Sequence, residues 1–376
     1  MSVGGPAKHV INLTKGLYKE GFETELLSGQ PNEAEDNFFE LASKNNIQVK
    51  ILKSMNRAIS PLKDLTSLFY IIKEIKRFKP DIVHTHTSKA GILGRLAALI
   101  CKVPAIYHTY HGHIFTGYLS KPASSIVIAI ERIFAAFSTN LISLTPKLTN
   151  EIKLILRPRH PENFVTIPLG LELEKNLFTP RRKNTWRTSA GFKDKDFIIG
   201  IIGRLVPIKN HFLIINSMSK LCTTFPNLHL AIIGDGELRT ELESLIKKLN
   251  LTNKIHFFGI IKDLEDIYSD LDLLILCSKN EGTPVVLIEA LASGCPVAST
   301  NVGGVSEVLE NGKLGRLLSS EPDIFTQGLY KAISDLLKNR FAEYPTDEIR
   351  KKISDYYSVN NLVSNIKKLY KDNFAD

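Results

Sequence analysis

Short runs of apolar, often β-branched residues recur along the chain, and a segment with helical spacing follows most of them. The runs in the first half are ETELLS (23–28), VKIL (49–52), DIVHTH (81–86), AIYHTY (105–110), NLISLT (140–145) and FVTIP (164–168). Those in the second half are FIIGIIG (197–203), LHLAIIG (228–234), KIHFFG (254–259), DLLILCS (272–278), PVAST (296–300) and GRLLS (315–319). Several runs are apolar throughout, as is typical of parallel strands covered on both faces. The pattern predicts two series of parallel strands joined by helices.

A stretch without periodicity separates the two series. Residues 168–196 mix proline, glycine and charged side chains, which is typical of a linker. At 376 residues, the chain also exceeds the roughly 250–300 residues at which a single core stops growing. We expect an α/β protein with two doubly wound domains, residues 1–172 and 173–355, facing a central cleft, and a C-terminal helix in residues 356–376. In open α/β sheets, ligands bind at the carboxyl ends of the strands.

The net charge is positive and unevenly distributed. Of the formal +9, residues 1–175 contribute +7, from 22 Lys+Arg against 15 Asp+Glu, and residues 176–376 contribute +2, from 26 against 24. The first half is expected to face nucleic acid, an anionic membrane or a phosphorylated substrate, unless the charge serves only solubility. Because no basic stripe with interleaved aromatic residues occurs, we expect no nucleic-acid partner.

Cysteine usage and the absence of targeting patterns bear on the compartment. The four cysteines lie in apolar segments without CxxC pairing, which suits reduced thiols. No signal-peptide pattern opens the sequence. The longest apolar run, residues 124–137, contains Glu131 and Arg132 and is too short to span a bilayer. We expect a cytoplasmic protein, either free or peripheral at the inner face of the plasma membrane.

Two glutamates bracket the apolar segment NEGTPVVLIEALASGCPV at residues 280–297. Thr283 and Pro284 have the form of an N-cap followed by proline at the first helical position. Glu281 is then expected in the loop before the helix and Glu289 in its second turn. Free N–H groups at a helix N-terminus favour an anion such as phosphate. The arrangement predicts a ligand with a central phosphate and hydroxyl groups at both ends, as in a nucleotide sugar.

Two cations follow another apolar run. Arg204 and Lys209 lie in GRLVPIKN at residues 203–210 and could take up the charge that develops on a pyrophosphate leaving group, although ordinary surface charge is the alternative. Many enzymes use Mg²⁺ for this purpose, but no DxD or HExxH motif occurs. The aspartates that cluster further along have spacings typical of a solvated helix surface; they are Asp263, Asp266, Asp270 and Asp272. We expect neither a metal site nor a cofactor.

Glycine and histidine mark further strand ends. IIGDGE at residues 232–237 is a tight turn, but any βα turn uses glycine, so the turn alone does not define a site. HTYHGH at residues 108–113 places three histidines at one strand end. A single histidine is more often structural, whereas three beside an expected cleft favour an active-site role for at least one.

These segments, in this order, resemble the retaining glycosyltransferases of family 4, which have the GT-B fold of two Rossmann-like domains. The resemblance covers nearly the whole chain and rests on GGPAKHVINL, DIVHTHTSKAGILGR, TYHGH, GRLVPIKN, IIGDGE and EGTPVVLIEALASGCPVASTNVGG. It implies metal-independent transfer of a sugar from a nucleotide-sugar donor with retained anomeric configuration. The family's usual proposal is a front-face reaction in which the leaving phosphate helps to deprotonate the acceptor.

The resemblance also implies roles for individual residues. Glu281 would bond hydroxyl groups of the donor sugar, and Glu289 would bond those of the ribose. Arg204 and Lys209 would hold the diphosphate. His111 would lie near the transferred sugar and, with Glu281 and the two cations, complete the catalytic set. Further substrate-binding positions are Gly4, Gly5, His113, Gly203, Gly234, Gly236, Gly259, Thr283, Val285 and Val286.

The segments VHTHTSKAGILGR and HGHIFTGY resemble the branch that builds bacterial surface polysaccharides, such as lipopolysaccharide, on lipid-linked acceptors. This implies a UDP-hexose or UDP-N-acetylhexosamine donor and a glycan or polyprenyl-pyrophosphate-linked acceptor. The basic first half would suit peripheral contact with an anionic membrane. In residues 70–80, Ile71, Ile72, Ile75 and Phe78 share one face. A helix packed on its own domain explains that face as well as a membrane does.

Both ends of the sequence bear on the expected fold. In the family, GGPA follows a central first strand, whereas only Met1, Ser2 and Val3 precede it here. Losing about five buried apolar residues, at roughly 1.5–3 kcal/mol each, would approach a domain's whole stability of about 5–15 kcal/mol. We expect the natural reading frame to start upstream, the alternative being a degenerate copy. Residues 360–374 resemble the family's closing helix, which returns to the first domain, although a plain terminal helix is the alternative.

Two other functions stay open. A nucleotide-sugar 2-epimerase shares the fold and would convert a UDP-sugar without an acceptor, but the EGTPVVLIEALASG pattern argues against it. An inactive sugar-nucleotide-binding protein would bind the donor without turnover. Donor, acceptor and linkage depend on loops such as residues 112–122, whose conformation the sequence does not determine.

Overall fold

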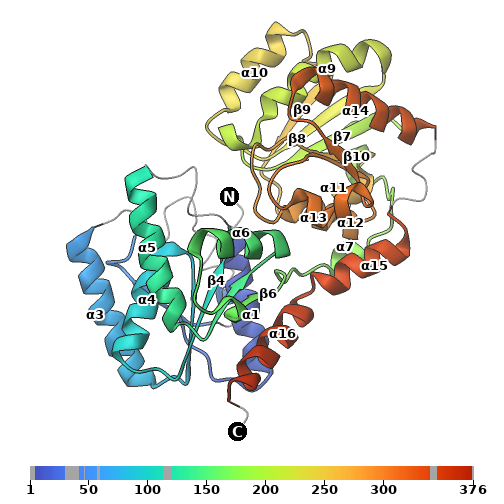
Figure 1. Cartoon of the computed structure of the whole chain (residues 1–376). Helices are drawn as coiled ribbons and strands as arrows, with labels where there is room; N and C mark the ends of the chain where they lie inside the picture. Colours follow the sequence, from blue (N-terminus) through green and yellow to red (C-terminus); the bar gives the residue numbers. More distant parts are fainter. Residues whose placement is uncertain are drawn as a thin grey trace. The chain divides into compact units, whose positions relative to one another are not determined.

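The computed structural model describes residues 5–29, 42–45, 47–56, 60–112, 121–338 and 345–374. The chain folds as two compact units (Figure 1): unit 1 comprises Met1–Leu171 with Tyr357–Asp376, and unit 2 comprises Glu172–Tyr356. Each of the twelve apolar runs singled out in the sequence forms a strand, and all the pairings between strands are parallel. The predicted α/β class is therefore confirmed.

Unit 1 contains two parallel sheets. Strands β1 and β2 pair with each other, the second sheet has the order β3-β4-β5-β6, and no ladder joins the two in the described part of the chain. The expected lack of a first strand concerns the residues before Gly5, which lie outside the described ranges. The elements of unit 1 are α1 (Gly5–Lys19), β1 (Leu26–Gly29), β2 (Val49–Leu52), α3 (Pro61–Phe78), β3 (Ile82–His86), α4 (Ser88–Ile100), β4 (Ala105–Tyr110), α5 (Lys121–Phe137), β5 (Asn140–Ser143), α6 (Pro146–Leu156), η2 (Pro161–Asn163), β6 (Phe164–Thr166) and α16 (Val359–Asp372).

Unit 2 contains one six-stranded parallel sheet of order β12-β11-β10-β7-β8-β9. The winding reverses between β7 and β10, and ligands of such sheets bind at the carboxyl ends of the strands beside this switch point. The elements of unit 2 are α7 (Glu174–Phe178), α8 (Thr185–Ser189), β7 (Phe197–Ile202), η3 (Pro207–Lys209), α9 (His211–Thr224), β8 (Leu228–Ile233), α10 (Arg239–Lys248), β9 (Ile255–Gly259), α11 (Glu265–Asp270), β10 (Leu273–Leu276), α12 (Val285–Ala292), β11 (Val297–Thr300), α13 (Val305–Val308), η4 (Glu310–Gly312), β12 (Arg316–Leu318), α14 (Pro322–Leu337) and α15 (Asp347–Tyr356).

The two central strands of unit 2 are buried along their whole length. β7 reads FIIGII and β10 reads LLIL, and every residue of both strands is buried. Ile214 of α9 and Phe325 of α14 pack into the same core as Ile199 and Ile201 of β7. Because helices cover both faces of these strands, neither face needs polar residues, which explains the unbroken apolar runs.

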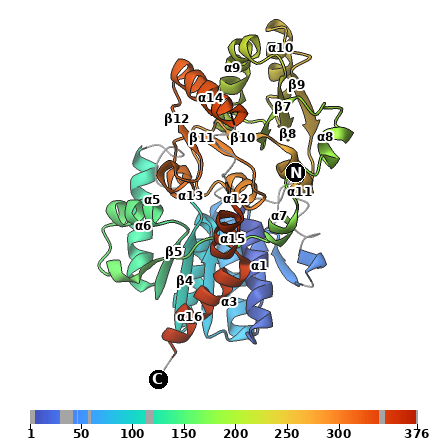
Figure 2. The same ribbon diagram turned by 90° about the vertical axis from the view of Figure 1, so that its right-hand side faces the viewer.

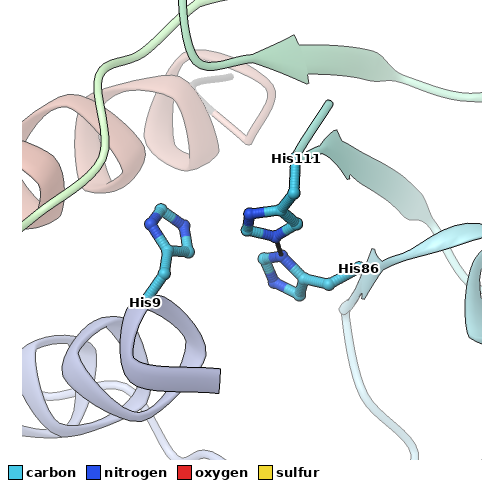
Figure 3. Close-up of side chains that lie close together, drawn as sticks. All are labelled: His9, His86 and His111. Atoms are coloured by element: carbon cyan, nitrogen blue, oxygen red, sulfur yellow. Dashed lines mark hydrogen bonds between the residues drawn. The ribbon is translucent and has the colours of Figure 1, made fainter. Parts of the chain in front are cut away.

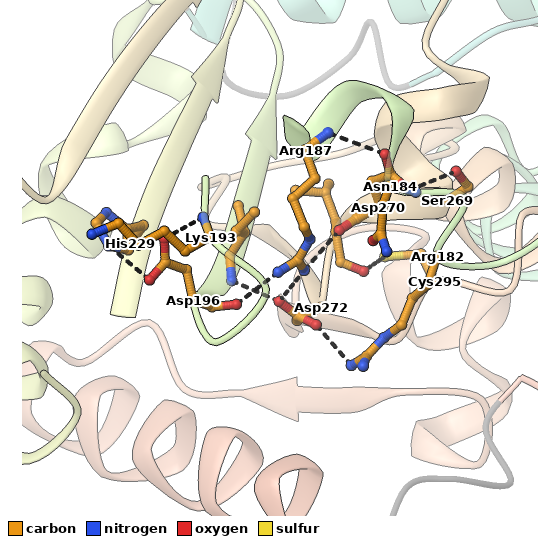
Figure 4. Close-up of polar contacts among 12 residues, drawn as sticks. Arg182, Asn184, Arg187, Lys193, Asp196, His229, Ser269, Asp270, Asp272 and Cys295 are labelled. Carbon is orange, nitrogen blue, oxygen red and sulfur yellow. Dashed lines mark hydrogen bonds and ion pairs between the residues drawn. The ribbon is translucent and has the colours of Figure 1, made fainter. Parts of the chain in front are cut away.

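A buried polar network holds the segment before β7 against α11 and the start of β10 within unit 2 (Figure 4). Asp270 accepts hydrogen bonds from the backbone N–H groups of Asn184 and Trp186, at 2.7 and 2.8 Å, and so caps α8. Asp272 accepts from the Arg187 guanidinium at 2.7 Å. Both aspartates are buried, so the expectation that they lie on a solvated helix surface is wrong. Their partners lie more than eighty positions away, beyond the reach of a local spacing argument.

The last helix packs within unit 1. α16 lies beside α1 (Figures 1 and 2), and Leu362 and Ile366 are buried in the same cluster as Leu17. The hydroxyl of Tyr370 lies 2.6 Å from Nδ1 of His84 in β3. α16 therefore covers the sheet of unit 1 and makes a polar contact with one of its strands.

The apolar face of residues 70–80 belongs to the core of unit 1. Ile71 and Ile75 are buried and pack with Leu52 and Ala97. For this face, the alternative of a helix packed on its own domain is the correct one. Among the helices described, none is both long enough and apolar enough to cross a bilayer.

Candidate functional site

The loops that follow β7, β8 and β9 meet at the carboxyl edge of the unit 2 sheet. The N–H of Gly203 donates to Ile233 at 2.9 Å, and that of Gly234 donates to Gly259 at 2.7 Å. Gly234 has a φ of +139°, and a Cβ there would lie 1.9 Å from the carbonyl oxygen of Gly203. Only glycine fits such an approach of two backbones. The structure thus brings Gly203, Gly234, Gly236 and Gly259, all expected at the site, to one edge.

Lys209 and Glu281 form an ion pair beside the switch point of this sheet. Lys209 ends η3, which follows β7, and Glu281 follows the neighbouring strand β10. Nζ of Lys209 lies 2.6 Å from Oε1 of Glu281, and the hydroxyl of Ser278 donates to the same oxygen at 2.5 Å. Both charged side chains are partly exposed, so a ligand at this edge could reach them. The sequence analysis did not assign Ser278 to the site. Its position just after a buried strand could have indicated that it lies at the carboxyl edge of the sheet.

A second backbone approach holds the loop that contains Glu281. The N–H of Gly304 donates to the carbonyl oxygen of Glu281 at 3.2 Å. Gly303 has a φ of +53°, and a Cβ there would lie 1.7 Å from that same oxygen. The hydroxyl of Thr300 donates to the carbonyl oxygen of Ser278 at 2.7 Å. The end of β11 and the loop after it therefore fix the backbone on both sides of the catalytic candidate.

α12 begins one residue later than the sequence suggests. Its N-cap is Pro284, whose ψ of 87° lies outside the helical range, and no side chain in the described ranges caps the helix. The expectation that Thr283 is the N-cap is therefore wrong, because the first helical residue is Val285. Thr283 lies in the loop between Glu281 and the helix. Val285 and Val286 occupy the first turn, where backbone N–H groups and the helix dipole favour an anion.

Glu289 lies in the second turn of α12, as expected, and a buried tyrosine orients it. The hydroxyl of Tyr268 donates to Oε2 of Glu289 at 2.7 Å. Tyr268 is fully buried, and burial, followed by the charge of Glu289, raises the pKa of Tyr268 well above its usual value. The phenol therefore stays protonated and serves as a donor. The sequence did not single out Tyr268, since the contact joins two helices and no strand end marks it.

Arg204 follows β7 and lies in the same turn as Lys209. Its side chain is exposed, and no ion-pair or hydrogen-bond partner for its guanidinium is present in the described part of unit 2. The turn therefore offers two cations of different character at one strand end. Lys209 is tied to a carboxylate, whereas Arg204 is open to solvent.

In unit 1, three histidines from separate elements converge (Figure 3). His9 belongs to α1, His86 ends β3, and His111 directly follows β4. Nδ1 of His86 lies 3.1 Å from Nε2 of His111, and the ring centroids of His9 and His111 are 5.0 Å apart. Gly5 is the first residue of α1, one helical turn before His9. Gly4 and His113 were also expected at the site, but both lie outside the described residues.

Burial keeps the imidazoles of this cluster neutral. It lowers the pKa of His9 to about 4 and that of His84, stacked on His86, to about 3. The pKa values of His86 and His111 are lowered well below the usual value, first by burial and then by the neighbouring histidines. At neutral pH these rings can donate or accept a hydrogen bond, but they carry no charge.

Neutral imidazoles are also metal ligands. One nitrogen from each of His9, His86 and His111 lies within 4.8 Å of the other two, so the cluster could hold an ion such as Zn²⁺. An ion bound at this cluster and needed for transfer would contradict the prediction of a metal-independent protein. His9 and His86 were not assigned to the site; His86 had the same signal as His111, its position at the end of a strand.

His108 belongs to the opposite face of β4. It is buried, its Nδ1 lies 2.8 Å from the hydroxyl of Thr85, and a Cβ at Gly91 would lie 2.5 Å from its ring. Of the strand-end histidines, His108 therefore packs between β3 and α4, whereas His111 faces the cluster.

Comparisons with known proteins identify the family of the chain. Residues 182–357 match the family model described as glycosyl transferases group 1, and residues 3–175 match that of glycosyltransferase family 4. The UDP-Gal:alpha-D-GlcNAc-diphosphoundecaprenol alpha-1,3-galactosyltransferase of Escherichia coli is 30% identical over 335 residues, which cover 87% of this chain and 84% of that protein. The capsular polysaccharide biosynthesis glycosyltransferase CapM of Staphylococcus aureus is 25% identical and covers 84% and 83% of the two chains.

Solved structures show the same architecture. The structure of Anabaena Alr3699/HepE in complex with UDP has a TM-score of 0.81 at 20% identity and covers 98% of this chain and 96% of that one. A glycosyltransferase from Rickettsia africae also has a TM-score of 0.81, at 19% identity, and covers 100% and 97%. At these identities the likeness to solved structures shows the fold alone. The family models and the Escherichia coli relative show the family. The chain therefore belongs to the family 4 glycosyltransferases and has the GT-B fold.

Proposed function

We propose that the protein is a retaining, metal-independent glycosyltransferase that moves a hexose or N-acetylhexosamine from a UDP-sugar to a glycan or polyprenyl-pyrophosphate-linked acceptor in the synthesis of bacterial surface polysaccharide. The observation that carries this proposal is the Lys209–Glu281 pair just ahead of α12. A cation, a carboxylate and a helix N-terminus beside one switch point suit a ligand with a diphosphate between two hydroxyl-bearing ends.

The donor would lie along α12. Glu281 accepts hydrogen bonds from the sugar hydroxyl groups, and Glu289, held by Tyr268, accepts those of the ribose. The N–H groups of Val285 and Val286 bind the diphosphate between them. The base lies against the glycine turns after β8 and β9. The names of the Escherichia coli relative and the UDP complex of the Anabaena protein support uridine as the base.

Lys209 and Arg204 would stabilise the leaving group. As the bond between the anomeric carbon and the phosphate oxygen breaks, negative charge grows on the diphosphate, and fixed cations favour that state. Lys209 is already oriented by Glu281, so little reorganisation is needed. The exposed Arg204 closes on the phosphate when the donor binds.

Configuration would be retained by a front-face reaction. The acceptor hydroxyl oxygen forms the new bond on the face that the diphosphate leaves, and its proton passes to the departing phosphate oxygen. The neutral His111 donates or accepts a hydrogen bond at the transferred sugar and takes no net charge, in keeping with its lowered pKa.

The acceptor would be lipid-linked. The printed activity of the Escherichia coli relative is transfer to a sugar on diphosphoundecaprenol, and the Staphylococcus aureus relative is named for capsular polysaccharide biosynthesis. The cationic first half of this chain suits an acceptor that carries a pyrophosphate at a membrane surface.

A donor and acceptor panel tests the proposal. The full chain is incubated with UDP-, GDP- and ADP-sugars and an alkyl-diphosphate-linked N-acetylglucosamine as the probe acceptor. We expect a UDP-sugar to be consumed only when acceptor is present, and NMR of the product to show the donor's anomeric configuration. Conversion of a UDP-sugar without acceptor would identify an epimerase, and donor binding without turnover would identify an inactive binding protein.

A further inference from the structure

The histidine cluster of unit 1 brings together side chains from three separate elements. One ring nitrogen from each of His9, His86 and His111 lies within 4.8 Å of the other two. Figure 3 shows the ring of His9, which comes from α1, opposite the other two rings. All three ligand atoms are imidazole nitrogens. This donor set suits Zn²⁺ and neighbouring transition metals, whereas Mg²⁺ and Ca²⁺ prefer oxygen ligands.

Two of these nitrogens already have nearly the separation that a shared ion requires. Nδ1 of His86 lies 3.1 Å from Nε2 of His111. With Zn–N bonds of about 2.0–2.1 Å at tetrahedral angles, two ligand nitrogens lie about 3.3–3.4 Å apart. In a hydrogen bond between neutral imidazoles, one nitrogen donates its proton to the other. When an ion takes the place of this proton, the proton moves to the second nitrogen of its own ring, and both imidazoles stay neutral.

The third histidine has a ring nitrogen that the fold does not pair. The side chain of His9 is 4% exposed, and its Nδ1 is buried without a hydrogen-bond partner among the described residues. The ring centroid of His9 lies 5.0 Å from that of His111 and 5.7 Å from that of His86. Because an unpaired buried nitrogen destabilises a protein, its presence beside two further imidazoles points to a ligand.

Neighbouring side chains hold the cluster in place. His84 and His86 alternate along β3, so they project from the same face of the sheet, and their rings stack with centroids 4.4 Å apart. Nδ1 of His84 lies 2.6 Å from the hydroxyl of Tyr370, and its Nε2 lies 2.8 Å from the hydroxyl of Thr109. Since both nitrogens of His84 have partners, His84 supports the ring of His86 and is not itself a ligand. Support of this kind around the ligands strengthens metal binding.

We propose that His9, His86 and His111 form a binding site for a divalent transition-metal ion such as Zn²⁺. Three nitrogens leave the fourth tetrahedral position to water, as in zinc sites with three protein ligands. The sequence analysis expected no metal site, because spacing along the chain cannot show that these three positions meet.

The proposed transfer reaction has no step that needs this ion. It does use His111 at the transferred sugar, so an ion that holds the His111 ring in place should inhibit transfer. This consequence rests on the proposed function, whereas the metal site itself does not.

Metal titrations of the full chain test the site without any substrate. The protein is dialysed against EDTA, and the chelator is then removed. Calorimetry follows the binding of Zn²⁺, and the visible absorption of Co²⁺ reports the ligands and geometry around that ion. We expect one ion of either kind per chain and no saturable binding of Mg²⁺ at the same concentrations.

Single substitutions locate the site. His9→Phe keeps a ring of similar size but removes one ligand, and should raise the Kd for Zn²⁺ at least about a hundredfold, because even outer-shell partners of metal ligands contribute roughly 10–100-fold. His86→Gln should weaken binding to a similar extent, and circular dichroism establishes which variants are folded.

A histidine pair in unit 2 provides the matched control. Nδ1 of His229 and Nε2 of His256 also lie 3.1 Å apart, but the described residues place no third ligand atom within 4.8 Å of both. His256→Asn should therefore leave the Kd for Zn²⁺ unchanged.

Three results would overturn the proposal. They are the absence of saturable Zn²⁺ and Co²⁺ binding, a Kd that neither folded cluster variant changes, and a Kd that the control variant raises as much as the cluster variants do.

Transfer to the water-soluble probe acceptor is measured in parallel. Zn²⁺ added to the dialysed protein should lower transfer, and EDTA should restore it. A chain that binds one ion through these histidines but never transfers sugar contradicts only the proposed function. Transfer that stays unchanged with the ion bound contradicts only the role given to His111, and a chain that transfers sugar but binds no ion contradicts only the metal site.

Discussion

Nζ of Lys209 lies 2.6 Å from Oε1 of Glu281, although 72 positions of sequence separate the two residues. The contact joins the turn after β7 to the loop after β10, the two strands on either side of the switch point. A cation that would neutralise a diphosphate and a carboxylate that would accept sugar hydroxyl groups therefore support each other before any donor binds.

Glu281→Gln should reduce transfer by about 10²–10³-fold, a loss typical of removing one fixed charge interaction at a reacting centre. The amide keeps the size of the side chain but loses the charge that orients Lys209. Stability should change by less than about 1 kcal/mol, because the ion pair is partly exposed. Initial rates and urea melts measure both, with Glu241→Gln on the exposed face of α10 as control. Near-normal rates would remove Glu281 from the catalytic set.

Tyr268→Phe should lower the free energy of unfolding by about 1–2 kcal/mol, because a buried hydrogen bond to a carboxylate is lost. It should also weaken donor affinity, since Glu289 would no longer be held toward the ribose. Denaturant melts and donor titrations report the two effects. Tyr330→Phe in α14, at a partly exposed position, should change neither. A loss of stability with unchanged donor affinity would show that Tyr268 does not position Glu289 for donor binding.

Gly303→Ala should disrupt the loop that contains Glu281, because the new Cβ would collide with the carbonyl oxygen of Glu281. We expect transfer to fall with the loss of donor binding. Gly191→Ala is the matched control: Gly191 also has a positive φ, but a Cβ there meets nothing within 4 Å. That variant should lose only about 1 kcal/mol of stability from backbone strain and keep its activity. Equal effects on donor binding would contradict the assigned loop geometry.

The buried histidines of unit 1 should make its stability depend on pH. Burial lowers the pKa of His9 to about 4 and that of His84 to about 3, whereas the unfolded chain titrates near the ordinary value of 6.5. Below that value the unfolded state binds more protons, so stability falls as the pH drops from 6.5 toward 4, by up to about 1.4 kcal/mol per pH unit for each histidine.

Urea melts between neutral pH and about pH 5 measure this slope. His84→Asn should reduce it, because one buried imidazole with a lowered pKa is removed. An unaltered slope in the His84 variant would show that its imidazole is protonated in the folded protein.

Removing metal ions should leave transfer unchanged, because the proposed reaction neutralises the leaving group with Arg204 and Lys209. The three-histidine cluster makes this a demanding test, since it could hold an ion. The full chain is dialysed against EDTA, assayed, and assayed again after Zn²⁺ or Mg²⁺ is added. Loss of activity on dialysis and recovery with either ion would contradict the cation assignment.

The strands were predictable because their burial has a local signature. β7 and β10 lie under helices on both faces, so their sequences are unbroken apolar runs. Gly203 after β7 and Gly234 after β8 follow from the close approach of neighbouring loops. Glu281 and Lys209 could be placed at strand ends for the same reason. The rule that parallel strands end at one edge then brings them together.

What the sequence could not provide depends on contacts between distant segments. His9, His86 and His111 meet only when α1, β3 and β4 assemble, and Asp270 is buried because α8 needs a cap. α5 is apolar on two sides, so periodicity alone could not say which stripe faces solvent. Even the one-residue error at the start of α12 came from the ψ angle of a single proline.

Titration calorimetry with UDP-galactose and other UDP-sugars tests the central claim. This claim is that unit 2 binds a nucleotide sugar through Lys209 and Glu281. We expect saturable one-to-one binding of at least one UDP-sugar, weakened at least about tenfold by Lys209→Ala because a charge-assisted contact to phosphate is lost. Lys220→Ala, which removes an exposed lysine of the same unit, should not affect the affinity. If no UDP-, GDP- or ADP-sugar binds, or if Lys209→Ala binds like the unchanged protein, the account is wrong.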